Sequence, residues 1–128
     1  MSILVVDDQP SICILLADAL EQAGYAVVTA TSGPAALTYL RQCTTLPRLI
    51  LLDIAMPRMT GWEFVREQQR TPALAAIPVI VMTALGEFGP EAEGAGIVAS
   101  LYKPLDLDRL FAYIHDHYGR QLRANFVA

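Results

Sequence analysis

Five polar residues with side chains able to bind a cation or attack a substrate stand at, or directly after, the end of an apolar run. They are Asp7, Asp8, Asp53, Thr83 and Lys103. The stretch LILLD, residues 49–53, shows the pattern most clearly, because four large aliphatic residues lead straight into a carboxylate. Such a run is typical of a strand buried on both faces. A charge at the end of a buried strand must be hydrated, paired, bound to metal or neutralised, so its neighbours decide its chemistry.

The elements that position these residues alternate between strand and helix patterns. Strands are predicted over residues 2–6, 25–30, 48–53, 77–83 and 97–102. The first predicted helix has Pro10 in its first turn and stops at Gly24, and later helices begin with the capping residues Ser32, Thr60 and Asp106. This alternation predicts a parallel sheet with helices on both faces, whose strands all end at one edge. The five polar residues should therefore converge at that edge.

Three carboxylates that converge in this way repel one another and raise each other's pKa values. A hard divalent cation relieves the repulsion, and Mg²⁺ suits a site with few protein ligands and several waters. Such a cation can hold a phosphoryl group while one carboxylate attacks phosphorus. A lysine and a threonine hydroxyl would stabilise the phosphoryl oxygens. Each residue alone is more simply a turn, a cap or a strand end, but their occurrence at four strand ends favours a joint function.

Four stretches of the chain resemble the receiver domain of bacterial two-component response regulators. They are VVDDQP, LLDIAMPRMTGWE, VIVMTA and YKP, and the resemblance covers residues 1–118. It implies an α/β fold of the flavodoxin-like receiver type: a doubly wound, five-stranded parallel sheet of order 2-1-3-4-5 with five flanking helices. Residues 119–128 would then be a C-terminal tail or the start of a linker.

The resemblance also implies a role for each residue of a metal site. Asp53 corresponds to the phosphoacceptor. Asp8, Asp53 and the backbone carbonyl of Ala55 would bind Mg²⁺ directly, and Asp7 would act through a metal-bound water. Mg²⁺ is the one cofactor expected.

Two further residues correspond to groups that contact the phosphoryl group in this family. Thr83 would contact it and move on phosphorylation, and Lys103 would pair with one of its oxygens. The peptide bond between Lys103 and Pro104 would be cis, as is usual in receivers.

The chain departs from the family pattern at two places. Residues 85–96 lie where the fourth helix of a receiver should be, and they contain Gly86, Gly89, Pro90, Gly94 and Gly96. Because glycine and proline disfavour helix interiors, we predict that this helix is short or absent. Ser100 stands at the position where receivers usually carry the aromatic residue that responds to phosphorylation. Tyr102 and Ser100 share one face of the strand, but Tyr102 lies two positions further along. Whether the usual coupling between Thr83 and an aromatic residue exists in this chain is therefore left open.

Composition limits the classes of function. The chain has 128 residues, 54% of them hydrophobic, and a formal net charge of -4. Its nine basic residues are scattered, which argues against direct nucleic-acid binding, and no apolar run is long enough to cross a membrane. Cys13 and Cys43 lack metal-ligand spacing. We expect a cytoplasmic signalling phosphoacceptor, not an enzyme acting on other substrates. Its partners would be a histidine kinase or histidine phosphotransfer protein and an unknown downstream protein, with homodimerisation left open.

Three other functions are compatible with parts of this pattern. An aspartyl phosphatase of the haloacid-dehalogenase type would carry its two aspartates two residues apart, whereas Asp7 and Asp8 are adjacent. A flavodoxin-like cofactor binder would need a phosphate-binding loop after the first strand, where DDQPS is acidic instead. A pseudo-receiver that works without phosphorylation keeps the same fold, and the altered segment 85–102 leaves it open.

Overall fold

Five parallel strands form one sheet in the order β2-β1-β3-β4-β5. The protein is described from a computed structural model, in which residues 2–83 and 96–115 are placed. The strands are β1 (Ser2–Val6), β2 (Ala26–Ala30), β3 (Leu49–Asp53), β4 (Val79–Thr83) and β5 (Ile97–Tyr102). The predicted strand order is confirmed, and each strand begins within two residues of its predicted start.

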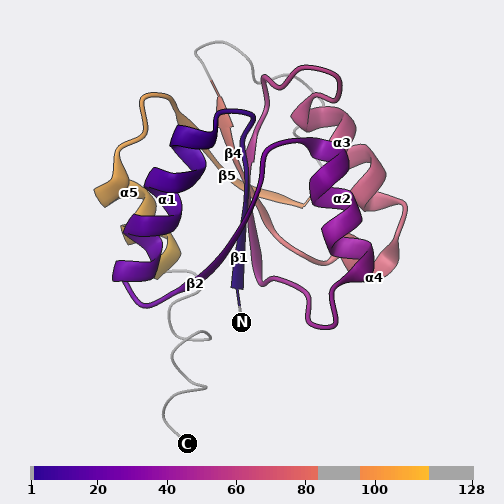
Figure 1. The fold of residues 1–128 in the computed structure, drawn as a ribbon, viewed down its shortest axis with the longest axis horizontal. Coiled ribbons are helices and arrows are strands. Elements are labelled where there is room, and N and C mark those ends of the chain that lie inside the picture. The colour runs from indigo at the N-terminus through magenta and orange to yellow at the C-terminus, as the bar shows by residue number, and fades with distance from the viewer. Residues whose placement is uncertain (1, 84–95, 116–128) are drawn as a thin grey trace, which may run out of the picture.

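Helices cover both faces of the sheet (Figure 1). They are α1 (Pro10–Gln22), α2 (Gly33–Gln42), α3 (Gly61–Gln69), α4 (Pro72–Ala75) and α5 (Leu107–Ile114). Helices α1 and α5 lie on one face, and α2, α3 and α4 lie on the other. None of the helices in residues 2–83 and 96–115 has both the length and the apolar character of a membrane span.

The four-residue helix α4 precedes β4 and was not predicted. It is held by Gln68, a fully buried residue of α3 whose Nε2 donates to the carbonyls of Leu74 and Ile77, at 2.8 and 3.0 Å. The helix that we predicted to be short or absent belongs after β4, and residues 84–95 lie outside the described part of the chain. The predicted boundary at residue 118 and the tail 119–128 lie outside it as well.

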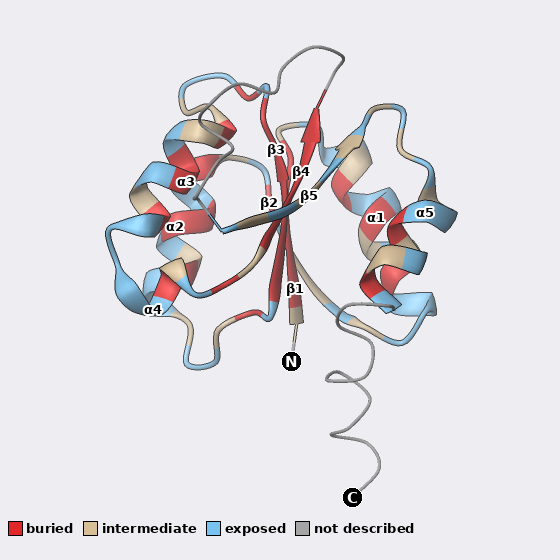
Figure 2. Ribbon diagram, turned by 180° about the vertical axis from the view of Figure 1, so that it is seen from behind, coloured by how far each residue is buried: buried red, intermediate tan, exposed pale blue. Residues whose placement is uncertain are grey.

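The three central strands are buried on both faces, which explains their continuous apolar sequences. Every residue of β3 and β4 is buried, as is every residue of β1 after Ser2 (Figure 2). Alternate side chains along each strand pack into two separate hydrophobic cores, one on each face of the sheet. Ile50 and Leu52 pack toward α2 and α3, whereas Leu49 and Leu51 pack toward α1 and α5. The sheet is thereby held between two helical layers.

Side-chain caps fix where three helices begin, as predicted. Ser32 Oγ accepts a hydrogen bond from the Ala35 N–H at 3.1 Å, and Asp106 Oδ1 accepts one from the Arg109 N–H at 3.2 Å. Thr60 and Glu63 form a reciprocal capping box at the start of α3. A cap of this kind contributes about 1 kcal/mol. Each of the three ends a connection at the carboxyl edge of the sheet, so the caps also fix the loops around that edge.

The edge strand β5 contains a bulge that decides which way its side chains point. Val79 pairs with Ile97, but Ile80 pairs with Ala99, so Val98 is an extra residue. As a result Ile97 packs toward α2 and α3, while Ala99 and Leu101 pack toward α1 and α5. Continuing the alternation places Lys103 on the α1–α5 side of the sheet.

The loop between β3 and α3, residues 54–60, ends close to the residue at which it begins. The Gly61 N–H donates to the carbonyl of Ile54 at 2.9 Å. A Cβ at Gly61 would lie 2.7 Å from the backbone oxygen of Asp53 and 2.8 Å from the Ile54 Cα. No side chain fits there without moving the backbone that carries Asp53.

Gly61→Ala tests this contact. Alanine is favoured by helix propensity at the start of α3, but the clash should lower the free energy of unfolding by about 2–3 kcal/mol. Gly24→Ala is the control, because a Cβ there has nothing within 4 Å and meets only the cost of a φ of +99°, about 1 kcal/mol. Urea denaturation measures both. Equal losses would mean that the loop yields to the added methyl group.

Candidate functional site

Asp7, Asp8 and Asp53 converge at the carboxyl edge of the sheet, as the strand pattern predicts. Each offers a carboxylate oxygen, and these oxygens all lie within 4.8 Å of one another. Asp7 and Asp8 directly follow β1, and Asp53 ends β3, the strand paired beside it. Asp7 and Asp53 are buried, and Asp8 is half-buried. Three carboxylates are therefore held together where little water can screen them.

Asp7 is held at every polar atom. Its Oδ1 accepts the Gln9 N–H at 2.9 Å, and its Oδ2 accepts a hydrogen bond from Lys103 Nζ at 2.9 Å. Its backbone N–H donates to the carbonyl of Ala30 at 3.1 Å, and its own carbonyl accepts from the thiol of Cys13. Asp7 has no exposed surface. Its carboxylate is thus engaged by the protein on both oxygens, which suits an indirect role toward a cation.

Lys103 bridges two of the three carboxylates. Its Nζ lies 2.9 Å from Asp7 Oδ2 and 3.3 Å from Asp53 Oδ1. Burial lowers the pKa of the ammonium, but the hydrogen bond to Asp7 and the charge of Asp53 outweigh burial, so the pKa is raised. Lys103 therefore stays protonated. Its backbone N–H donates to the carbonyl of Thr83, and the following bond to Pro104 is cis.

The charge of Asp53 is less well compensated than that of Asp7. Burial and the charge of Asp7 raise its pKa to about 6, although the charge of Lys103 and its hydrogen bond oppose the rise. Lys103 is closer to Asp7 than to Asp53, which explains why it does not prevent the increase. Asp53 Oδ1 also accepts the Ala55 N–H at 3.3 Å. A buried carboxyl group with a raised pKa is a candidate functional group.

The donor set fits a hard divalent cation. It consists of carboxylate oxygens, the ligand type that Mg²⁺ prefers, and it carries more negative charge than Lys103 neutralises. Asp8 is half-buried and makes no ion pair with another described residue. A cation that contacted Asp8 and Asp53 would lower the pKa of Asp53 again.

The other predicted site residues lie on β4, on β5 and shortly after β3. Thr83 ends β4 and is fully buried, but by alternation its side chain points to the α2–α3 side of the sheet, opposite Lys103. Ala55 is exposed. Ser100 is exposed and pairs with Val81, whereas Tyr102 pairs with Thr83. The aromatic residue of β5 is therefore the register neighbour of the threonine, a position that residue counting from Lys103 did not indicate.

Sequence reasoning did not find the groups that hold Asp7. The Gln9 N–H and the Cys13 thiol contribute through backbone position and helix phase. No residue type in DDQPSIC signals either contact. The position of Cys13 six residues after Asp7, on the buried face of a helix, was the one available clue.

The family model for the response regulator receiver domain matches residues 3–115. The chain belongs to the response regulator receiver family. This receiver domain is 33% identical over 124 residues to Response regulator Rre1 of Synechocystis, covering 94% of this chain and 53% of the relative. It is 40% identical over 114 residues to Response regulator PleD of Caulobacter vibrioides, covering 88% of this chain and 25% of that protein.

Solved structures agree with the sequence comparison. Chemotaxis protein CheY4 of Vibrio cholerae superposes with a TM-score of 0.79 at 30% identity, covering 90% of this chain and 96% of that one. A response regulator receiver protein from Pseudomonas putida gives a TM-score of 0.81 at 25% identity, covering 90% and 95%. The chain spans between a quarter and about half of the length of the curated relatives it matches. Receiver domains are signalling phosphoacceptors rather than enzymes acting on other substrates, as the resemblance implies.

The raised pKa of Asp53 predicts a pH-dependent effect of Asp53→Asn on stability. Because the folded-state pKa of about 6 lies above the unfolded value, the stability contributed by protonated Asp53 is complete below about pH 4. It is lost as pH rises through 6. Without metal, Asp53→Asn should therefore raise the free energy of unfolding at pH 8, by about 1–3 kcal/mol, and by much less at pH 4.

Urea denaturation in EDTA at several pH values measures this difference. Asp18→Asn is the matched control, because Asp18 is an exposed residue of α1, and it should show little change between pH 5 and 8. A constant difference for Asp53→Asn across this range would show that its carboxyl titrates normally.

Proposed function

We propose that this receiver domain accepts a phosphoryl group on Asp53 from the phosphohistidine of a histidine kinase or histidine phosphotransfer protein. The observation that carries the proposal is the approach of three carboxylate oxygens within 4.8 Å, with Lys103 bridging Asp7 and Asp53. The phosphorylated domain would then control a downstream protein or an output domain. Such relays are cytoplasmic in this family, and we propose the same location.

The proposed reaction is a displacement at phosphorus. A carboxylate oxygen of Asp53 forms the new P–O bond, the P–N bond to the donor imidazole breaks, and the electron pair leaves with that nitrogen. The Lys103 ammonium, already 3.3 Å from Asp53 Oδ1, is placed to neutralise negative charge on the phosphoryl oxygens. We propose that Thr83, the last residue of β4, supplies a hydroxyl to the phosphoryl group after its side chain adjusts.

We propose that Asp8, Asp53 and the carbonyl of Ala55 hold Mg²⁺ directly and that Asp7 acts through a water. When bound, the ion neutralises charge and polarises the phosphoryl group. The occupied oxygens of Asp7 support its indirect role. The half-buried position of Asp8 supports its direct one.

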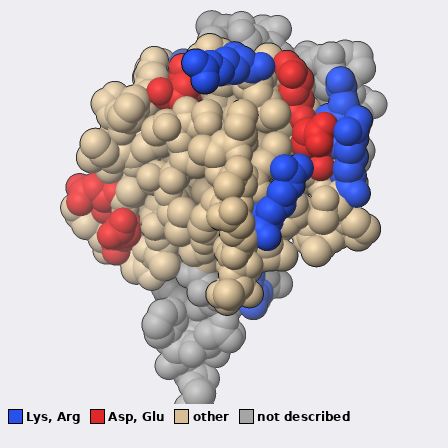
Figure 3. All heavy atoms as spheres, turned by 45° about the vertical axis from the view of Figure 1, so that its right-hand side comes forward, with Lys and Arg blue, Asp and Glu red and all other residues tan. Residues whose placement is uncertain are grey.

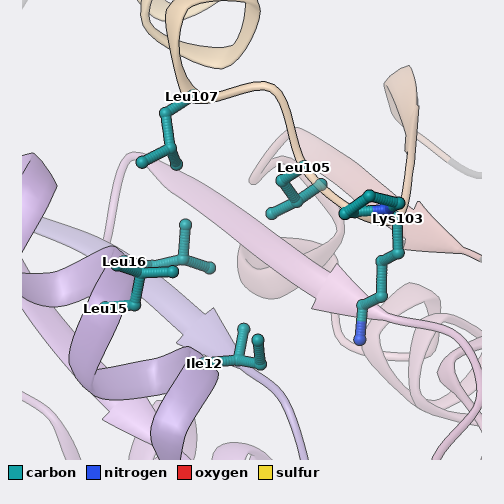
Figure 4. A pocket seen from close by; sticks show the side chains of 7 residues that line it. Ile12, Leu15, Leu16, Lys103, Leu105 and Leu107 are labelled. Atoms are coloured by element: carbon teal, nitrogen blue, oxygen red, sulfur yellow. The ribbon is translucent and has the colours of Figure 1, made fainter.

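An apolar groove beside the site supports docking of a protein donor. It has a volume of about 220 Å³ and lies between α1 and the segment that follows β5 (Figure 4). Its lining residues are Ile12, Leu15, Leu16, Lys103, Pro104, Leu105 and Leu107. Leu15 is 52% exposed, although it is a large aliphatic residue. Because Lys103 belongs both to the groove and to the acidic site, a helix packed in the groove would present its phosphohistidine to Asp53.

Asp53→Asn should abolish phosphorylation. The wild-type domain, incubated with acetyl phosphate and Mg²⁺, should gain one phosphoryl group by intact-protein mass spectrometry, and EDTA should prevent the gain. Asp108→Asn, a change at an exposed residue of α5, should react like the wild type. A phosphoryl group retained by Asp53→Asn would contradict the proposal, and an unreactive wild type would favour the pseudo-receiver.

Leu15→Lys tests the groove. A charge there should slow transfer from an autophosphorylated histidine kinase by roughly tenfold or more, since a buried aliphatic contact is worth about 1.5–3 kcal/mol. The rate with acetyl phosphate should stay within about twofold. Several autophosphorylated histidine kinases are first compared, and the one that transfers its phosphoryl group fastest to the wild-type domain serves as the donor. Val98→Lys is the matched control, because Val98 is 41% exposed on β5, away from the groove. Equal slowing of both variants would remove the groove from the proposal.

A further inference from the structure

The carboxylates of the acidic site differ in their surroundings from the charges on the surface. Figure 3 shows basic and acidic side chains next to one another along the upper and right-hand parts of one face. Asp7, Asp8 and Asp53 instead lie together, and two of them are buried. Because like charges at this separation repel one another, the backbone that carries them has to be fixed from inside the domain.

Cys13, in the first turn of α1, contacts the backbone of this site directly. Its Sγ donates to the carbonyl of Asp7 at 3.4 Å and lies 3.8 Å from the carbonyl of Ala30. The carbonyl of Ala30 also accepts the Asp7 N–H at 3.1 Å. The thiol therefore lies where the carboxyl ends of β1 and β2 meet the start of α1.

Asp8 is placed between two contacts that fix the chain on either side of it. Before it, the Asp7 carbonyl accepts from the Cys13 thiol. After it, the Gln9 N–H donates to Asp7 Oδ1 at 2.9 Å. Cys13 is itself held, since its N–H donates to the carbonyl of Gln9 at 3.3 Å. Because a peptide unit is planar, the direction of the Asp7 carbonyl also sets the direction of the Asp8 N–H and the path of the chain into Asp8.

The thiol keeps the hydrogen that this contact needs. Burial raises the pKa of Cys13, and the charges of Asp7, Asp8 and Asp53 raise it further, although the hydrogen bond to the Asp7 backbone lowers it. Burial is the largest cause, and it is present whether or not a cation occupies the site. Cys13 is thus a small apolar residue that also donates a hydrogen bond, a combination that alanine does not offer.

We propose that Cys13 is a positioning residue for Mg²⁺, whose thiol fixes the peptide unit between Asp7 and Asp8 and so holds the Asp8 carboxylate in place to bind the ion. The inference rests on the proposed metal site. Mg²⁺ demands near-octahedral geometry, so the displacement of one ligand lowers affinity. Groups that orient metal ligands from behind are typically worth about 10–100-fold in affinity, and a thiol, as a weak donor, should lie at the lower end.

Cys13→Ala and Cys13→Ser separate the hydrogen bond from the packing. The two replacements are similar in size, but only serine keeps a donor for the Asp7 carbonyl. Cys13→Ala should raise the Mg²⁺ dissociation constant roughly three- to tenfold, and Cys13→Ser should stay within about twofold of the wild type. Titration of Mg²⁺ against the NMR signals of the isotope-labelled domain measures these constants.

Cys43→Ala is the matched control. The Cys43 Sγ also donates to a backbone carbonyl, that of Leu40 at 3.5 Å, but it does so at the C-terminal end of α2. The loss of this bond should leave the Mg²⁺ dissociation constant unchanged.

Two further readouts distinguish positioning from a general loss of stability. Without metal, the NMR signal of the Asp8 amide should shift in Cys13→Ala and return toward the wild-type position in Cys13→Ser. With acetyl phosphate, Cys13→Ala should need more Mg²⁺ for half-maximal acylphosphate formation, while the rate at saturating Mg²⁺ should change little because Asp53 is intact. All rates are measured well below the melting temperatures of the variants in EDTA.

An unchanged Mg²⁺ dissociation constant in Cys13→Ala would overturn the inference. Equal losses of affinity in Cys13→Ala and Cys13→Ser would also overturn it, because the effect would then belong to the lost volume. A wild type that binds Mg²⁺ but forms no acylphosphate would refute the proposed function, while the dissociation constants of the variants would still decide the inference. A wild type that binds no Mg²⁺ would refute both.

Discussion

The crowding of three carboxylates around one ammonium is the constraint on which this molecule depends. Their oxygens lie within 4.8 Å of one another at the end of a sheet whose interior is apolar. Such an arrangement is unfavourable unless positive charge is supplied. Lys103 supplies part of it and leaves an excess of negative charge. The site is therefore held by the core in a state that favours a divalent cation, and the stability of the core makes this possible.

Two chemically identical side chains, those of Asp7 and Asp53, have different surroundings, which suits them to the different roles that we propose. Asp7 accepts a backbone N–H and the nearer contact of Lys103. Asp53 has the longer lysine contact and a raised pKa. One carboxylate is consequently fixed as part of the scaffold, while the other keeps the unsatisfied charge that suits a nucleophile and metal ligand. The surroundings of the two carboxylates, rather than their residue type, make their charge and their contacts different.

Loops at the carboxyl edge connect the site to the surface on both sides. On the α1 side, Lys103 belongs to the acidic site and to an apolar groove. On the α3 side, Gly61 touches the backbone of Asp53 and ends the loop that holds Arg58. On β5, Tyr102 is the register neighbour of Thr83, so an aromatic residue stands beside the threonine even though Ser100 occupies the usual position. These contacts join the carboxyl edge of the sheet to the surface of the domain.

The sequence by itself determined the fold class, the strand order through the family resemblance, three helix caps and the convergence of the acidic residues. These features follow from local patterns: apolar runs, capping residues and polar residues at strand ends. The tertiary structure alone decided the bulge at Val98, the helix α4, the hold on Asp7 by Gln9 and Cys13, and the left-handed backbone of Arg58. The bulge depends on how β5 packs against β4. The other three depend on how segments close in sequence fold back on one another in space. The residue types involved do not specify the course of the backbone, so the sequence pattern did not predict these contacts.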